Sequence, residues 1–459
     1  AASDVYKRQV YVIYKTVDGM TAFPKIHYFC TLRNIFSETM SIHLLAPERI
    51  DARIQLPSSK SICNRALILN ALSGSKWLLG NLSDCDDTRV MVRAFEEGGP
   101  DFDIMAAGTA MRFLTAYLAQ CEGVWTITGS ERMRHRPIRL LVDALRSLGA
   151  RIDYLGEEGF PPLRIYGKML EGGRLMLSAG VSSQYISALL MVAPYMREGL
   201  ILSLVGEMIS KPYIMMTLSM MRQWGMDSVW NGNEIRVLPG RYKPVHFSVE
   251  SDWSAASYWY EIAALVPGAV VELSGLHDVS VQGDSRVSEF FAHLGVETDF
   301  LHDGVRLRHV GMSDRSCLSV DLTNQPDLAQ TLVVTCVLLH RPFCFTGLQS
   351  LKIKETDRIA ALKCELAKLG YRITDREDSI LEWNGEQTEA EHLPAIDTYD
   401  DHRMAMAFAP ACIFYPGLEI RCPEVVSKSY PAFWEHLRQA GFEISRVCLL
   451  YTSPSPRDS

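Results

Sequence analysis

Charged side chains crowd residues 351–370, LKIKETDRIAALKCELAKLG. The second half of this stretch has the apolar spacing of an amphipathic helix that ends at Gly370. Lys354 and Arg358 fall at the predicted helix start, where the helix dipole favours anions and disfavours cations. A solvated, charged helix start would explain them without any ligand. A bound anion beside the helix start would explain why cations occur there. On this interpretation, the segment predicts an anion-binding site.

Two more predicted helices start with groups that bind anions. LPSSKSICNR supplies Lys60, Ser61 and, about one turn later, Arg65. Backbone amides, a hydroxyl and two cations suit phosphate or carboxylate, although a capped helix with a surface lysine is the alternative. GTAMRF begins with Gly108 and Thr109, and glycine lets the backbone approach a ligand closely. A plain Gly-Thr helix cap would leave the same pattern.

Neutral hydrogen-bonding residues mark a further helix start. VSSQYISALL places Ser182, Ser183 and Gln184 before an apolar run, which suits a hydroxylated, phosphorylated substrate. N-capping by a serine explains this pattern equally well. The segment ISKPY, with Ser210 and Tyr213, resembles it but is less distinctive. These residues are candidates for the neutral part of a binding site.

Acidic and basic residues also precede apolar helices in the last third of the chain. PDLAQT puts Asp327 beside an apolar helix, where an unpaired carboxylate is costly, and a role as N-cap is the alternative. YDDHRMAMAF brings His402 and Arg403 to another start, and a histidine here is more often a packed or capping residue than a catalyst. Arg136 in RMRHRP and Lys428 in VVSKSYPAF complete a set of cations that flank helix ends in an acidic protein.

The elements that position these residues recur along the chain. Six predicted helices begin with small, polar or charged residues and then become almost wholly apolar, which is typical of buried helices: 60–72, 108–119, 182–194, 251–265, 326–339 and 400–413. Amphipathic helices alternate with them and end at glycines spaced by roughly 70 to 76 residues: Gly149, Gly225, Gly295, Gly370 and Gly441. A degraded sixth copy ends near Gly98. Each unit therefore contains strand, helix, strand, helix and further strands.

Six units predict a mixed α/β protein of two domains, each with three buried helices inside and sheets outside. We expect residues 58–250 to form the first domain, and residues 42–57 with 251–446 to form the second. Residues 1–41 show no sustained period and residues 447–459 become Ser/Pro-rich, so we interpret both as flanking extensions that look non-native.

Composition narrows the classes of function. The chain has 459 residues, 47% of them hydrophobic and 22% charged, with a formal net charge of −8. This acidic balance argues against nucleic acid as a partner. The 11 cysteines are scattered without a CxxC pair, which favours free thiols in a reducing cytoplasm. No apolar run is long enough for a membrane span, and no metal motif such as HExxH is present, so we expect a cytoplasmic protein without a membrane partner.

The motifs together resemble one family. LPSSKSICNRALIL, AAGTAMRFL, RMRHRPIRLLVDALRSLGA, SSQYISALLM, PDLAQTLVV, LKIKETDRIAAL, YDDHRMAMAFA and VSKSYPAFW occur in the order found in the EPSP synthase family, 3-phosphoshikimate 1-carboxyvinyltransferases. The resemblance covers residues 42–446. It implies transfer of the enolpyruvyl group from phosphoenolpyruvate to the 5-hydroxyl of shikimate 3-phosphate, in the shikimate pathway, with release of phosphate.

The same resemblance implies a fold of two inside-out α/β barrel-like domains, each of three repeated βαβαββ units with buried parallel helices. It also implies a monomer that needs no metal or redox cofactor. Glyphosate, which competes with phosphoenolpyruvate in this family, would be expected to bind.

The resemblance also assigns roles to individual residues. The expected shikimate 3-phosphate site contains Lys60, Ser61, Arg65, Ser182, Ser183, Gln184, Ser210, Tyr213, Asp327, Ser350 and Lys354. The expected phosphoenolpyruvate site contains Lys60, Gly108, Thr109, Arg136, Gln184, Arg358, Arg403 and Lys428. Asp327 resembles the base for the 5-hydroxyl and Glu355 the proton donor and acceptor at the methylene group, with Lys60 assisting and His402 a further catalytic candidate.

Several positions depart from the family pattern. Ser350 stands where asparagine is common and contacts the shikimate phosphate, so a hydroxyl must substitute or the contact is lost. Ala106 replaces an asparagine, Phe113 a proline, and Ser58 a glycine. These departures concern affinity and the response to inhibitors more than the type of reaction.

Two alternatives stay open from the sequence alone. The enolpyruvyl transferase that acts on UDP-N-acetylglucosamine shares the fold but should carry a catalytic cysteine in a loop. Cys63 and Cys121 lie instead within or at the ends of predicted apolar helices. The second alternative is a non-catalytic anion-binding protein of the same fold, which would not need Asp327, Glu355 and Lys60 together.

Overall fold

The computed structural model describes residues 40–74, 79–180 and 182–447. Within them, Ser41–Arg446 form one compact unit. The predicted flanking extensions, 1–41 and 447–459, lie almost entirely outside the described residues. Among the residues that are described, no helix is long and apolar enough to cross a membrane.

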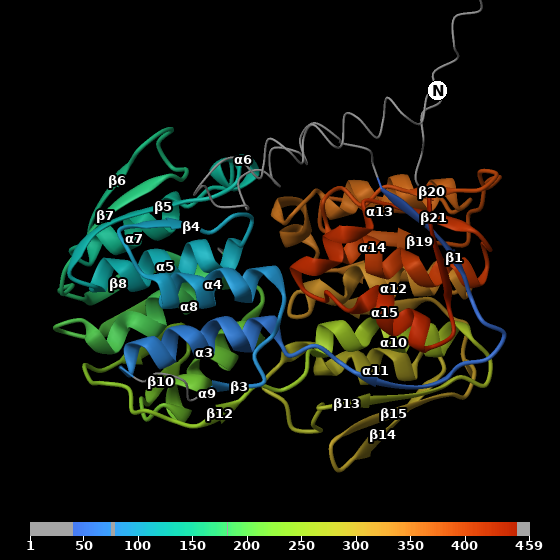
Figure 1. The fold of residues 1–459 in the computed structure, drawn as a ribbon, viewed down its shortest axis with the longest axis horizontal. Helices are drawn as coiled ribbons and strands as arrows, with labels where there is room; N and C mark the ends of the chain where they lie inside the picture. Colours follow the sequence, from blue (N-terminus) through green and yellow to red (C-terminus); the bar gives the residue numbers. More distant parts are fainter. Residues whose placement is uncertain (1–39, 75–78, 181, 448–459) are drawn as a thin grey trace, which may run out of the picture. The chain divides into compact units, whose positions relative to one another are not determined.

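A first hydrophobic core is built from residues between Ile62 and Val249. Its helices are α3 (Lys60–Leu72), α4 (Asp86–Glu97), α5 (Gly108–Gln120), α6 (Glu131–Arg134), α7 (Arg139–Ser147), α8 (Ser183–Val192) and α9 (Lys211–Gln223). Its strands are β3 (Leu79–Gly80), β4 (Asp101–Asp103), β5 (Gly123–Thr128), β6 (Arg151–Tyr154), β7 (Leu163–Gly167), β8 (Gly173–Ser178), β9 (Leu200–Val205), β10 (Ser228–Asn231), β11 (Glu234–Val237) and β12 (Phe247–Ser248). Helices α3, α5 and α8, coloured blue to green in Figure 1, pack against one another.

A second core joins residues 42–56 to residues 253–442. Its helices are α10 (Trp253–Leu265), α11 (Val287–Ala292), α12 (Ala329–Leu338), α13 (Arg358–Lys368), α14 (His402–Phe408) and α15 (Phe433–Gln439). Its strands are β1 (Ser41–Leu45), β2 (Asp51–Gln55), β13 (Val270–Ser274), β14 (Val296–Leu301), β15 (Gly304–His309), β16 (Leu318–Asp321), β17 (Phe343–Thr346), β18 (Thr374–Arg376), β19 (Ile380–Trp383), β20 (Ala395–Ile396), β21 (Leu418–Arg421) and β22 (Glu443–Val447). Figure 1 shows the blue strand β1 beside the red strand β21, with which it pairs antiparallel.

The sheets repeat one pattern of strand directions. In four of them a parallel pair is followed by two antiparallel neighbours: β4-β5-β7-β6, β8-β9-β11-β10, β2-β13-β15-β14 and β16-β17-β19-β18. A fifth sheet has the order β20-β21-β1-β22, again with a parallel pair and an antiparallel neighbour. Strands β3 and β12 form a short parallel sheet. The repeated units predicted from the sequence therefore have a counterpart in how the strands pair.

A helix lies at each of the six positions where the sequence predicts a buried one. Every residue of α12 and every residue of α14 is buried, because most of their side chains are apolar and no face of either helix is polar along its length. The predicted helix-ending glycines also take the expected conformation, with φ between 83° and 100° at Gly149, Gly225, Gly295, Gly370 and Gly441. A positive φ closes a helix at little cost only when the residue is glycine.

One helix start differs from the prediction. Residues Gln349–Ile353 form a separate 3-10 turn, and α13 begins only at Arg358, after Asp357 caps it by accepting from Ala360 N at 3.1 Å. Lys354 therefore lies in a loop before the helix, and the prediction that it stands at the helix start was wrong. The aspartate cap explains the difference, since its side chain satisfies a free amide of the first turn.

Glu261 is an unusual residue in α10, because it is fully buried in the second core. Within the described part of the chain, neither of its carboxyl oxygens has a well-formed hydrogen bond. Burial raises the pKa of Glu261 well above its ordinary value. The hydroxyl of Thr335 already donates to Thr331 O at 2.7 Å, so it can accept from a neutral Glu261 but cannot donate to an ionised one. The folded protein therefore keeps Glu261 protonated.

This burial predicts a stability that depends on pH. The unfolded chain loses the Glu261 proton above about pH 4.3, whereas the folded chain keeps it, so the residue costs stability as pH rises, by up to about 1.4 kcal/mol per pH unit. Glu261→Gln removes this cost. We expect the variant to unfold at higher urea concentration than the wild type at pH 8, and by a smaller margin at pH 5. A margin that stays constant across this range would contradict the protonated Glu261.

Candidate functional site

A cavity of about 180 Å³ lies where the helix starts of both cores meet. The first core contributes the starts of α3, α5, α8 and α9, and the second contributes those of α10 and α14 together with the loop before α13. The sequence places polar residues at these starts, and the dipoles of helices aimed at one space favour an anion there. Buried apolar helices thus deliver their polar ends to a common pocket.

The pocket brings together nearly all of the predicted site residues. Those that line it are Lys60, Ser61, Arg65, Gly108, Thr109, Arg136, Ser182, Ser183, Gln184, Ser210, Tyr213, Asp327, Ser350, Lys354, Glu355, Arg358, His402 and Arg403. Lys428 does not line the cavity. It contacts the site indirectly, with its Nζ 3.3 Å from Oε1 of Glu355.

Asp327 lies at the centre of a cationic group. Its Oδ1 is 3.2 Å from Arg358 Nη1 and 3.7 Å from Lys354 Nζ, and its Oδ2 is 3.0 Å from Arg403 Nη2. Tyr213 also donates its hydroxyl to Oδ2, at 3.0 Å. Burial by itself raises the pKa of Asp327, but the charges of Arg403, Lys354 and Arg358 outweigh it and hold the pKa well below its usual value. Asp327 is therefore ionised at neutral pH.

Glu355 is a second buried carboxylate in the same pocket. Arg358 Nη2 lies 2.9 Å from its Oε2, and Lys428 lies on the other oxygen. Burial raises the pKa of Glu355, yet Lys428, Arg358 and Arg136 together hold it well below its usual value. With these partners Glu355 is ionised, and it needs a change in the charges around it before it can donate a proton.

Arg358 links three carboxylates while exposing only 1% of its surface. Besides Asp327 and Glu355, it donates from Nε to Asp401 Oδ2 at 2.7 Å and from Nη2 to Asp401 Oδ1 at 3.3 Å. Asp401 also caps α14 by accepting from Arg403 N at 2.9 Å. The guanidinium is thus held in a fixed orientation, which favours binding of a planar carboxylate or of a phosphate.

Lys60 and His402 face the same cavity with different charges. Lys60 Nζ pairs with Asp87 Oδ2 at 3.4 Å. Burial lowers the pKa of Lys60, but the nearby acidic groups, Asp87, Cys85 and Glu355, raise it above its usual value. Burial and the cations Lys60 and Arg403 lower the pKa of His402 well below its usual value, so the imidazole is neutral. As far as the described residues go, neither ring nitrogen of His402 has a hydrogen-bond partner.

Residues of the first core supply hydroxyl, amide and guanidinium groups. Arg65 donates from Nε to Thr217 at 2.7 Å, and its other donors reach Ser61 O, Ser187 and Tyr213 O, which leaves little capacity for a ligand. Gln184 Nε2 donates to Thr109 Oγ1 at 3.2 Å. Arg65 therefore fixes its neighbours in the pocket wall and has one N–H group left for a ligand.

Gly108 lies close to the guanidinium groups of two arginines that line the pocket. A Cβ at Gly108 would lie 2.6 Å from Arg136 Nη1 and 3.1 Å from Arg112 Nη1. A side chain at position 108 would therefore press on the ends of both arginine side chains, which would have to shift.

Several polar residues that line the pocket were not predicted from the sequence: Asp87, Arg112, Asp252, Ser254 and Tyr258. The six-fold repeat contained a signal for Asp252, since it opens the buried helix α10 and caps it by accepting from Ser254 N at 2.8 Å. Arg112 follows Gly108 by one helical turn and donates to its carbonyl at 2.9 Å. Asp87 had no such signal, because its helix α4 belongs to the degraded repeat.

Buried Asp284 adds a carboxyl group just behind the pocket wall. Its Oδ2 accepts a short hydrogen bond from Ser254 Oγ, and its Oδ1 has no partner among the described residues. Burial, and then the charge of Asp327, raise the pKa of Asp284 to about 7. Across the parts of the chain that are described, no group of three or more His, Cys, Asp or Glu residues is placed to hold a metal ion.

A mixed α/β fold whose pocket sets lysines and arginines around two buried carboxylates defines an enzyme that acts on small, multiply charged anions. The sequence profile of EPSP synthase (3-phosphoshikimate 1-carboxyvinyltransferase) matches residues 44–102 and 99–437. The chain belongs to the EPSP synthase family, a family of transferases.

Individual relatives agree with this assignment. A 3-phosphoshikimate 1-carboxyvinyltransferase from Bacteroides fragilis (strain YCH46) is 59% identical over 402 residues, which cover 87% of this chain and 98% of the relative. One from Vibrio cholerae (strain M66-2) is 35% identical over 428 residues, covering 87% and 99%. The solved structure of an EPSP synthase from Acinetobacter baumannii has a similar fold, with a TM-score of 0.69 at 22% identity, over 89% of this chain and all of that one.

Proposed function

We propose that this chain transfers the enolpyruvyl group of phosphoenolpyruvate to the 5-hydroxyl of shikimate 3-phosphate and releases phosphate. The observation that carries this proposal is the set of cations around Asp327 and Glu355. Three of them contact Asp327 and two contact Glu355, in a protein whose net charge is −8. Such a local concentration of positive charge suits two substrates that together carry two phosphates and two carboxylates.

The proposed subsites divide the pocket. Shikimate 3-phosphate would be held by Lys60, Ser61, Arg65, Ser182, Ser183, Gln184, Ser210, Tyr213, Asp327, Ser350 and Lys354. Phosphoenolpyruvate would be held by Lys60, Gly108, Thr109, Arg136, Gln184, Arg358, Arg403 and Lys428. In this division, most of the hydroxyl-bearing residues bind the polyhydroxylated substrate, and three of the four arginines bind phosphoenolpyruvate.

In the proposed reaction, Glu355 gives a proton to the methylene carbon of phosphoenolpyruvate while the 5-hydroxyl oxygen attacks its C2. Asp327 takes the hydroxyl proton as the new C–O bond forms. In the second step Glu355 removes a proton from the resulting methyl group, the bond from C2 to the phosphate oxygen breaks, and the phosphate leaves with the proton held by Asp327. Lys60 stabilises the phosphate in both steps, and His402 lies beside Glu355 and Lys60 as a neutral imidazole.

The proposed reaction requires Glu355 to be protonated at its start, but the neighbouring cations favour the ionised carboxylate. Substrate anions resolve the conflict. When phosphates and carboxylates bind to Arg136, Arg358 and Lys428, they neutralise the charges that lower the pKa of Glu355, so this pKa rises towards the value that burial alone would give. Binding of the substrates would thus favour the protonated form of Glu355, which can then act as the acid.

The finer architecture is also a proposal. The repeated strand pattern and the two hydrophobic cores support two inside-out, barrel-like domains of three βαβαββ units, covering 58–250 and 42–57 with 251–446. Since both domains supply site residues, closure of one on the other would complete the pocket. We propose that the enzyme acts as a cytoplasmic monomer.

Phosphate release tests the function directly. Purified protein with phosphoenolpyruvate and shikimate 3-phosphate is expected to release phosphate, and omission of either substrate should abolish it. Release with UDP-N-acetylglucosamine in place of shikimate 3-phosphate would favour the related transferase. No release with either acceptor would favour a non-catalytic anion-binding protein.

Ser350 allows a milder prediction about affinity. Its side chain lines the pocket at a position where the family commonly has asparagine, and an amide reaches further and donates more hydrogen bonds than a hydroxyl. Ser350→Asn is expected to lower the KM for shikimate 3-phosphate about five-fold, equivalent to about one hydrogen bond, with kcat unchanged. Ser350→Ala should raise the same KM. Equal KM values for all three proteins would remove residue 350 from the phosphate site.

A further inference from the structure

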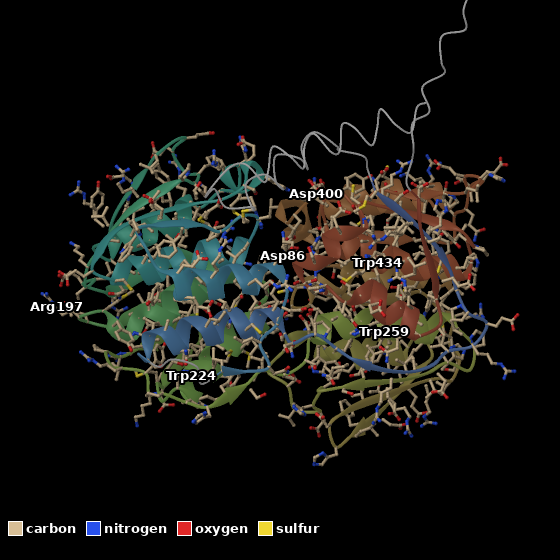
Figure 2. The ribbon with its side chains drawn as sticks, in the orientation of Figure 1. Asp86, Arg197, Trp224, Trp259, Asp400 and Trp434 are labelled. Atoms are coloured by element: carbon tan, nitrogen blue, oxygen red, sulfur yellow. The ribbon has the colours of Figure 1, made fainter. Side chains whose placement is uncertain are left out.

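The turn that precedes α14 has an unusual backbone. Asp401 N donates to Thr398 O at 2.8 Å, and the two residues between them, Tyr399 and Asp400, have φ of 53° each. Asp400, at the tip of this turn, is labelled in Figure 2. Consecutive positive φ values suit glycine, asparagine or aspartate, and tyrosine is rarely found in this conformation. Such a turn persists only where its surroundings hold it.

Glu365 of α13 holds the turn from inside the protein. Its side chain is fully buried, and Oε1 accepts from the hydroxyl of Tyr399 at 2.6 Å. Its Oε2 accepts from Asp397 N at 3.0 Å and pairs with Lys368 Nζ at 2.7 Å. Lys368 in turn reaches Asp397 Oδ2 at 2.8 Å and Ala395 O at 2.9 Å. Glu365 therefore fastens α13 to residues 395–399, directly through Asp397 and Tyr399 and indirectly through Lys368 of the same helix.

A second contact joins the same helix to the same turn. Arg358 and Glu365 lie seven residues apart on α13, about two helical turns, and so share one face. Arg358 is bound by Asp401, the residue that ends the turn, and Asp401 also caps the helix that starts with His402 and Arg403. The turn is thus attached to α13 at two points, Glu365 to Tyr399 and Arg358 to Asp401. On its exposed side, Arg132 Nη1 also donates to Tyr399 O at 3.5 Å and to Asp400 Oδ2 at 3.4 Å.

We propose that Glu365 and Tyr399 are positioning residues for the anion site, which hold the 398–401 turn so that Asp401 keeps Arg358 and Arg403 aimed into the pocket. Neither Glu365 nor Tyr399 lines the cavity. Without their hydrogen bond, the turn would relax from its positive φ values, and Asp401 would lose its place relative to both arginines. This inference rests on the proposed function, in which these two arginines bind phosphoenolpyruvate.

Two tyrosines donate hydrogen bonds to α13: Tyr399 to the side chain of Glu365, and Tyr415 to the backbone at the end of the helix. Tyr399→Phe removes the hydrogen bond to Glu365. Tyr415→Phe is the matched control, because the hydroxyl of Tyr415 donates to Leu369 O at 2.6 Å, at the C-terminal end of α13 and away from the turn. Tyr399→Phe is expected to raise the KM for phosphoenolpyruvate about ten-fold, as loss of a hydrogen bond to a charged group predicts, and to change the KM for shikimate 3-phosphate by less than about two-fold. Tyr415→Phe should change neither.

A pair of substitutions at Glu365 separates positioning from general stability. Glu365→Gln keeps an oxygen that can accept from Tyr399, whereas Glu365→Ala does not, so the rise in KM for phosphoenolpyruvate should be smaller for glutamine. The proposal is overturned if Tyr399→Phe leaves this KM unchanged, if both KM values rise together, or if Tyr415→Phe gives the same rise.

Crystal structures of Tyr399→Phe and Tyr415→Phe make the test independent of the proposed reaction. We expect the Arg358–Asp401 contact to lengthen or break in the first variant only. A wild-type protein that does not turn over these substrates would defeat the proposed function, but an Arg358–Asp401 contact kept intact in both variants would overturn the positioning role itself.

Discussion

Asp327→Asn is expected to lower kcat by about a thousand-fold, because an amide cannot take the proton of the 5-hydroxyl. The substitution keeps the shape of the side chain, and Tyr213 can still donate to its oxygen. It removes the negative charge that Arg403, Arg358 and Lys354 now contact, so these cations become more available to substrate anions. We therefore expect the KM for phosphoenolpyruvate to stay the same or fall. Steady-state kinetics with each substrate varied in turn checks both values.

The control for this substitution is Asp299→Asn. Asp299 also pairs with an arginine, Arg308, at 2.8 Å, but it lies on β14, and it does not line the pocket. This variant should keep its kcat. A catalytic rate of Asp327→Asn within a few-fold of the wild type would remove Asp327 from the proton transfer.

Glu355→Gln is expected to lower kcat by about a hundred-fold to a thousand-fold. Without an acid at this position, the methylene carbon of phosphoenolpyruvate is not protonated efficiently. C2 then does not become electrophilic enough for the 5-hydroxyl to attack it. The loss should therefore appear in the chemical step, with phosphate release in a single turnover slowed as much as kcat. Rapid-quench measurement of one turnover separates this from slow product release.

Glu386→Gln serves as its control, since Glu386 pairs with Arg372 at 3.2 Å on the protein surface. Its single-turnover rate should match the wild type. If Glu355→Gln slowed only the steady state and left the single turnover unchanged, Glu355 would act in release of product and not in protonation.

The periodicity of the sequence predicted the elements that build the pocket better than it predicted their boundaries. Buried helices such as α12 are mostly apolar on every side, and their length separates them from buried strands. The start of α13 was placed too early because the charges from Lys352 to Arg358 do not reveal where the 3-10 turn ends and where Asp357 caps the helix. The start of the helix depends on one side-chain contact, the cap by Asp357, and the pattern of charges does not show which residue makes it.

The sequence also indicated which residues bind anions, but not how they pair with one another. Lys428 and Glu355 are 73 positions apart in the chain, and only the fold brings them to 3.3 Å. The pair of Asp87 and Lys60 is of the same kind, since the two residues lie on different helices. Likewise, the hydrogen bond from Tyr399 to Glu365 depends on a turn with positive φ values at non-glycine residues. No sequence motif predicts such a turn.

The fate of solvent hydrogen tests the central claim, transfer by addition and elimination, most directly. The protein is incubated with phosphoenolpyruvate and shikimate 3-phosphate in D₂O, and the product is examined by NMR and mass spectrometry. Because Glu355 would deliver a deuteron to the methylene carbon and then remove one hydrogen from the transient methyl group, we predict deuterium in the methylene group of an enolpyruvyl ether, together with one phosphate released per product. Formation of pyruvate and a doubly phosphorylated shikimate, with no enolpyruvyl ether, would contradict the account, since it would mean transfer of the phosphoryl group.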